Sequence, residues 1–202
     1  MKAGRILQRV EITPGFVALL CAYFYFDPAG TFAPFLLGVT LHEGAHLLML
    51  RLVRSRVHRL SFSLAGAVIK TAPLPYRQEI LVAAAGPSVN FLLFLLFVRQ
   101  MPMAALVNLC LFVYNLLPFY PLDGGRILRA VLHALLSDTA ADLIERIVGG
   151  LCLLSLCGAA CYLTCALHAG LWPVLVCALL IVKTAGIFAP REKDRVIFQS
   201  CG

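Results

Sequence analysis

Two histidines four residues apart, with a glutamate next to the first, form the most reactive pattern in the 202-residue chain. They are His42, Glu43 and His46, in the order H-E-x-x-H. Residues four apart lie on the same face of a helix, so both imidazoles can bind one zinc ion. Glu43 projects at an adjacent angle, from which it can take a proton from a water in the open coordination position. The pattern predicts zinc-assisted hydrolysis, with two histidine ligands and Glu43 as the base.

This pattern lies inside an apolar segment, which we expect to be a membrane-spanning helix over about residues 31–50. Ionisable side chains inside a span are expensive to bury and are functional by default. The simpler alternative is that the three polar side chains merely pair with one another.

Zinc needs a third protein ligand. Asp27 and His168 belong to the opposite membrane face, whereas Asp123 lies on the face nearer to the two histidines. The histidines are expected roughly 6–12 Å below that face, from a rise of about 1.5 Å per residue. Two prolines and two glycines break the helix within residues 115–125, and broken backbone at membrane depth occurs where it is buried in protein or lines a cavity. Asp123 is therefore the favoured third ligand, and a helix N-cap is the alternative.

The composition of the chain indicates what kind of elements must position these residues. Hydrophobic residues make up 61% of the chain and charged residues 13%, against about 45–50% and about 25% in soluble domains. A soluble globular domain and a disordered chain are therefore excluded. The net charge is +7, but no basic stripe with interleaved aromatics occurs, so nucleic acid is not an expected partner.

Six apolar segments are expected to span the membrane, at about residues 12–26, 31–50, 78–98, 103–117, 147–167 and 171–188.

The basic residues set the orientation. With six spans, 16 of the 17 Lys and Arg residues fall on one side, which should be cytoplasmic. We therefore predict an all-α polytopic membrane protein with about six transmembrane helices. It forms one domain over residues 1–202, with a catalytic core at about 31–125 and a short tail at 189–202. Both termini are expected in the cytoplasm, and the compact size favours a bacterial cell membrane.

A short β-hairpin is predicted between the second and third spans. Leu60, Phe62 and Leu64 alternate with polar residues, which is typical of a strand, and Gly66 allows a turn. One interpretation is a solvated hairpin. The other is a sheet that dips into the membrane beside the zinc. Its edge would pair with an unwound substrate by strand addition, because a helical peptide bond is shielded from attack.

Three motifs together resemble the site-2 protease family of intramembrane zinc metalloproteases. They are the H-E-x-x-H pattern, an N-x-x-P-x-x-x-L-D-G pattern over residues 115–124 and a G-P-x-x-N element over residues 86–90. Gly86 and Pro87 are also explained by a helix kink and a close helix approach. Asn90, at the end of this element, is expected to face the site and to contact the substrate.

The resemblance implies a role for each residue that matches the family's motifs. His42, His46 and Asp123 would bind one Zn²⁺ ion, Glu43 would be the catalytic base, and Asn115 would contact the substrate near the metal. The family also favours the substrate-pairing interpretation of the hairpin. The expected reaction is hydrolysis of a peptide bond near the cytoplasmic face.

The size and the six-span layout are most similar to the branch that contains stage IV sporulation protein FB, which processes a membrane-associated sigma-factor precursor. That protease carries a C-terminal nucleotide-sensing domain. Only about 14 residues follow the sixth segment here, so such regulation is not expected. The expected partners are a membrane-embedded or membrane-associated protein substrate, the lipid bilayer and regulatory membrane proteins.

Two functions from other classes stay open. A metal-ion transporter would need polar groups across the full membrane depth, and here they cluster on one side. A catalytically inactive membrane scaffold would be expected to lack Glu43 or a zinc ligand, and the sequence retains them all.

Overall fold

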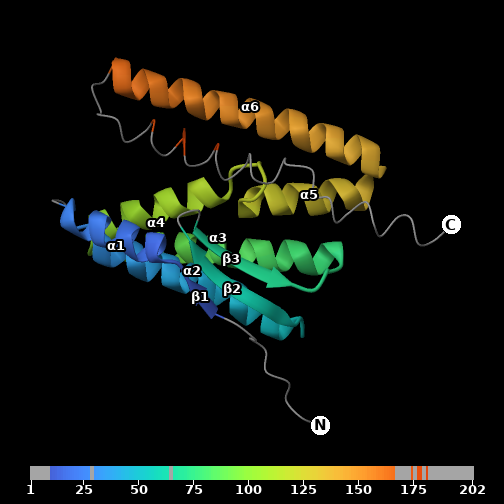
Figure 1. Cartoon of the computed structure of the whole chain (residues 1–202), viewed down its shortest axis with the longest axis horizontal. Helices are drawn as coiled ribbons and strands as arrows, with labels where there is room; N and C mark the ends of the chain where they lie inside the picture. Colours follow the sequence, from blue (N-terminus) through green and yellow to red (C-terminus); the bar gives the residue numbers. More distant parts are fainter. Residues whose placement is uncertain are drawn as a thin grey trace, which may run out of the picture. The chain divides into compact units, whose positions relative to one another are not determined.

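The computed structural model describes residues 10–27, 30–63 and 66–166, together with positions 174, 177, 178 and 181. The chain divides into two compact units, residues 1–152 and 153–202, and the site described below lies in the first. The elements in chain order are β1 (Val10–Ile12), α1 (Pro14–Tyr25), α2 (Phe32–Leu52), β2 (Val57–Ser63), β3 (Gly66–Thr71), α3 (Tyr76–Phe97), α4 (Pro102–Asn115), α5 (Asp123–Leu135) and α6 (Asp138–Cys165), as labelled in Figure 1.

Three of the described helices, α2, α3 and α6, are long and apolar enough to cross a membrane. The helices α1 and α4 are apolar but have only 12 and 14 residues. These five helices correspond to the first five predicted spans. The helix α6 begins at Asp138 rather than near residue 147 because its first turns are charged and were not part of the apolar pattern. The sixth predicted span, 171–188, lies almost entirely outside the described residues, so the six-span count and the single domain stay predictions.

The predicted hairpin is confirmed. The strands β2 and β3 pair antiparallel, with Leu60 opposite Ile69. A third strand, β1, pairs parallel with β2 and places Val10 opposite Leu60. The first predicted span, at about residues 12–26, overlaps the end of β1 at Ile12, because three residues are too few to show a period-two pattern. The strand order β1-β2-β3 puts β3 at an edge of the sheet. Leu64 lies outside the described residues.

A small apolar core joins the end of α2, the sheet and α3. Leu50, Val57 and Val82, one from each of these elements, are almost completely buried. Ile69 of β3 and Leu74 pack against this cluster. Burying such side chains is worth roughly 1.5–3 kcal/mol each. The cluster therefore holds the sheet against the pair of helices that carries the polar residues of interest.

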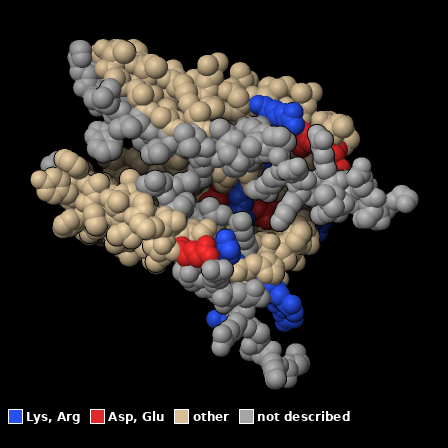
Figure 2. Space-filling model, in the orientation of Figure 1, with Lys and Arg blue, Asp and Glu red and all other residues tan. Residues whose placement is uncertain are grey.

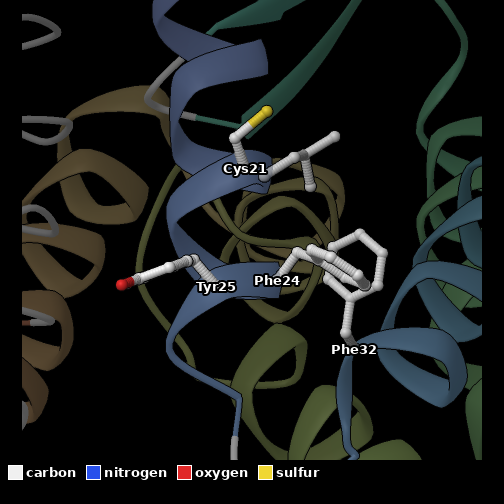
Figure 3. Close-up of a pocket in the computed structure, with 5 residues that line it drawn as sticks. Cys21, Phe24, Tyr25 and Phe32 are labelled. Atoms are coloured by element: carbon white, nitrogen blue, oxygen red, sulfur yellow. The ribbon is translucent and has the colours of Figure 1, made fainter.

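The outer surface of α1 is apolar. None of its residues is buried, and Phe24 and Tyr25 are 69% and 81% exposed. Figure 3 shows a hollow between α1 and the start of α2, lined by the side chains of Leu20, Cys21, Phe24, Tyr25 and Phe32. In Figure 2 the surface over α1 is free of charged side chains, which gather over the sheet and around α5. Exposed apolar surface of this extent is typical of contact with lipid.

The turn between α5 and α6 is held by His133. Its Nδ1 lies 2.9 Å from Asp138 Oδ1, and its Nε2 lies 3.3 Å from Asp142 Oδ1. This histidine of α5 therefore contacts the first turns of α6.

The helices α2 and α4 approach closely at Gly38. A methyl group added to Gly38 would lie 2.7 Å from Asn108 Oδ1 and 3.0 Å from Leu111 Cδ1, both on α4. Asn108 is itself buried and donates its amide N–H to the carbonyl of Ala104. Because the neighbour is a buried, hydrogen-bonded side chain, it has little freedom to move away.

We predict that Gly38→Ala destabilises the protein by about 1–3 kcal/mol, the usual cost of overpacking a well-packed site. The measurement is the midpoint of thermal or denaturant unfolding in mild detergent. Gly44→Ala is the matched control on the same helix, since no described atom lies within 4 Å of its added methyl group. Equal midpoints for the two variants would contradict the close approach.

Candidate metal centre

Two helix segments bring three polar side chains to one buried point. His42 and His46 lie one turn apart on α2, and Asp123 is the first residue of α5. The two Nε2 atoms are 3.0 Å apart. Asp123 Oδ2 lies 3.1 Å from Nε2 of His42 and 3.2 Å from Nε2 of His46. The three residues are 5%, 3% and 6% exposed, respectively.

The three atoms have the chemistry and spacing of a zinc site. Neutral imidazole nitrogens and a carboxylate oxygen are common zinc ligands. Ligand atoms about 2.0–2.1 Å from a tetrahedral zinc are about 3.3 Å from one another, close to the 3.0–3.2 Å between these atoms. Three protein ligands leave a fourth position open, which is the arrangement of catalytic zinc sites. His42, His46 and Asp123 therefore fit one ion.

The helix α3 carries hydrogen-bond partners for both histidines. His46 Nδ1 lies 2.7 Å from the carbonyl oxygen of Val82, to which it donates. The amide nitrogen Nδ2 of Asn90 lies 3.0 Å from Nδ1 of His42. Partners of this kind orient a metal-binding imidazole and select which nitrogen is free for the metal. Both rings are therefore held with Nε2 toward Asp123.

Gly86 lets α3 come this close to the rings. A methyl group at Gly86 would lie 2.6 Å from both Cε1 and Nε2 of His42 and would also collide with Nε2 of His46. These imidazoles are themselves fixed by hydrogen bonds and cannot turn aside freely. The close approach proposed for the G-P-x-x-N element is thus an approach to the candidate ligands themselves.

The irregular segment between α4 and α5 sets the position of Asp123. Phe119 and Leu122 in this segment are 3% and 2% exposed, so the broken backbone is buried in protein. A methyl group on Gly124 would collide with the backbone of Leu116, and one on Gly125 with the backbone of Phe119. Only glycines allow this segment to lie against the start of α5. Since Leu122 is the N-cap, the alternative role of Asp123 as an N-cap is wrong.

The second oxygen of Asp123 faces a charged pair. Arg126 Nη1 lies 3.5 Å from Asp123 Oδ1, and Arg126 Nη2 lies 2.7 Å from Glu79 Oε1 of α3. Burial alone would raise the pKa of Asp123. The close contacts with His42 and His46 outweigh this effect and hold the pKa well below its ordinary value. Asp123 is therefore an ionised carboxylate.

Two further predicted residues, Glu43 and Asn115, have different surroundings in the structure. Glu43 is half-buried and close enough to His46 for its charge to act on that ring. Asn115 ends α4 and donates to the carbonyl of Leu111 in its own helix.

The predicted hairpin residues have packing roles within the described chain. Leu60 is 6% exposed, and the ring of Phe62 packs on Phe16 of α1 with centroids 5.4 Å apart. Gly66 begins β3 opposite Ser63. Their predicted substrate contacts stay predictions.

Sequence reasoning missed three contributors to the site: Glu79, the carbonyl of Val82 and Arg126. A backbone carbonyl carries no signal in residue type. Arg126 could have been found, since it is three residues after Asp123 and shares its helix face.

Comparisons with known proteins agree with this geometry. The sequence profile of Peptidase family M50 matches residues 97–156, which include Asp123 but not the two histidines. Zinc metalloprotease MJ0392 of Methanocaldococcus jannaschii is 34% identical over 107 residues, which are 46% of this chain and 32% of that protein. A zinc metalloprotease of Synechocystis sp., sll0528, whose name is provisional, is 31% identical over 109 residues, which are 46% of this chain and 28% of that protein.

These matches cover part of the chain and show that this part is similar to peptidase family M50 and to zinc metalloproteases. The chain spans about a third of the length of the zinc metalloproteases it matches. The solved structure of the site-2 protease from Methanocaldococcus jannaschii has the same fold, with a TM-score of 0.64 over 88% of this chain and 89% of that one, at 21% sequence identity.

We predict that Gly86→Ala lowers the zinc content of the protein at least tenfold, because the methyl group occupies space held by the two imidazoles. The measurement is zinc per protein in the purified full-length chain after mild chelation. Far-ultraviolet circular dichroism checks that the helices remain. Gly44→Ala, beside the ligands but in open space, should bind zinc like the wild type. Wild-type zinc content in Gly86→Ala would show that the site lies elsewhere.

Proposed function

We propose that the chain is an intramembrane zinc metalloprotease that hydrolyses a peptide bond of a membrane-embedded or membrane-associated protein. The observation that carries this proposal is the buried convergence of His42 Nε2, His46 Nε2 and Asp123 Oδ2 within 3.2 Å of one another, with Glu43 one residue from a ligand. The partial matches to peptidase family M50 and to zinc metalloproteases support it.

One Zn²⁺ ion held by these three side chains would supply a Lewis acid that acidifies a water molecule and polarises the scissile carbonyl. Glu43 then accepts the proton of the attacking water. It delivers that proton to the leaving nitrogen as the peptide bond breaks. The position of Glu43, next to His42 and close to His46, suits both steps, because the same carboxylate must reach the water and the departing amine.

The substrate would be held extended at the free edge of β3. This strand pairs with β2 on one side, and no described strand covers its other side. An added strand would gain main-chain hydrogen bonds and expose its peptide bonds to attack. Leu60 and Phe62 support this role by anchoring the sheet through their packing. Asn115 would contact the substrate after its amide leaves the carbonyl of Leu111.

Cleavage is proposed near the cytoplasmic face. His46 and His42 lie 6 and 10 residues before the end of α2 at Leu52, or roughly 9 and 15 Å along the helix axis. The basic residues that follow α2 place that end in the cytoplasm. A bacterial cell membrane, cytoplasmic termini and a sigma-factor precursor as substrate are finer proposals supported by the charge pattern and the resemblance to the sporulation branch.

We predict that Glu43→Gln keeps zinc but lowers cleavage about 10²–10⁴-fold, the usual contribution of a general acid–base group. Wild type and variant are expressed in the source cell and purified in mild detergent. Zinc is measured directly, and co-purifying proteins are identified by mass spectrometry. A membrane protein that is intact on the variant and shortened in wild-type cells is the substrate.

Glu145→Gln is the matched control, since this glutamate lies on α6 and faces Arg129. It should cleave like the wild type. Normal cleavage by Glu43→Gln would refute the proposed mechanism. Identical uncut partners on all three proteins would favour a scaffold, and zinc flux through vesicles carrying the wild type would favour a transporter.

A further inference from the structure

Asn90 is buried against a candidate zinc ligand. Its exposed fraction is 0%, and its Nδ2 lies 3.0 Å from Nδ1 of His42. An amide nitrogen only donates hydrogen bonds, so Nδ1 of His42 accepts here. The ring hydrogen is then on Nε2, which lies 3.1 Å from the acceptor Asp123 Oδ2. Asn90, His42 and Asp123 thus form a consistent hydrogen-bond chain.

Zinc binding requires the opposite arrangement on the ring. A metal takes the lone pair of Nε2, so the ring hydrogen must be on Nδ1. Nδ1–H would then face the two hydrogens of Asn90 Nδ2, which repel it. His46 has no such conflict, because its Nδ1 already donates to the carbonyl of Val82. The two ligands therefore differ: one is ready for the metal, and the other is not.

Asn90 can remove the conflict by turning its own amide. Its Oδ1 is buried and has no hydrogen-bond partner among the described residues, so the turn breaks no hydrogen bond of that oxygen. After a half-turn, Oδ1 accepts from His42 Nδ1–H, as the partners of metal-binding histidines usually do. The same movement takes Nδ2 away from His42, so the number of hydrogen bonds made by the Asn90 side chain does not change.

We propose that Asn90 is a positioning residue that selects the tautomer of His42. Its Oδ1 would accept the hydrogen of His42 Nδ1 and so leave Nε2 of His42 free for the zinc ion. This inference rests on the proposed function, because it assumes that zinc is the ion held by His42, His46 and Asp123. It assigns Asn90 to the ligand rather than to the substrate.

The test compares zinc affinity in full-length variants by competition with a chelator in mild detergent. Asn90→Leu cannot accept a hydrogen bond and should bind zinc about 10–100-fold more weakly. In Asn90→Asp, the ionised carboxylate only accepts hydrogen bonds, which favours the His42 tautomer with its hydrogen on Nδ1. This variant should bind zinc at least as tightly as the wild type. The zinc-induced rise in Tm is the second measurement. It should be small for Asn90→Leu and at least as large as the wild-type rise for Asn90→Asp.

Asn108→Leu is the matched control. Asn108 lies on α4 and is also buried, and its Oδ1 also has no partner among the described residues. It packs against Gly38 of α2, the helix that carries both histidines. No hydrogen bond joins it to either histidine ring among the described residues. Its zinc affinity should be unchanged. Wild-type affinity in Asn90→Leu, or an equal loss in Asn90→Leu and Asn90→Asp, would overturn the proposal. If the wild type itself bound no zinc, the proposed function would fail first.

Discussion

The rest of the structure depends on satisfying polar side chains that are buried in an apolar helix bundle. His42, His46 and Asp123 are each at most 6% exposed, and a buried polar group without a partner costs about 1–3 kcal/mol. The helix α3 contributes none of the three, yet the carbonyl of Val82 and the amide of Asn90 bond to the two histidines. One helix therefore fills the space beside the rings and meets their hydrogen-bond requirements.

These contacts come from a single stripe of α3. Glu79, Val82, Gly86 and Asn90 are spaced by three, four and four residues, which puts them on one face of a helix. Glu79 extends the same stripe to α5 through its ion pair with Arg126. A sliding or rotation of α3 would disturb all three candidate ligands together. The stripe thus explains how a helix without ligands can control the geometry of the whole site.

Local patterns in the sequence predict the parts of the site that depend on nearby residues. The four-residue interval fixes the common face of His42 and His46, and the clustered prolines and glycines reveal the broken segment before Asp123. The hairpin follows from a period of two. Pairings between distant residues are not predicted. Glu79 and Arg126 are 47 residues apart, and β1 is too short to show a period before β2 is present to pair with it.

Asn90 shows where sequence reasoning stops. Its phase on α3 gives the direction in which it points, and that direction is toward the site. The neighbouring helix decides what it meets there, and His42 of α2 occupies that place. On our proposal, Asn90 uses its amide for His42 rather than for an incoming peptide. On our proposal, the polar groups of α3 therefore serve the ligands, and substrate recognition is left to the edge of β3 and the end of α4.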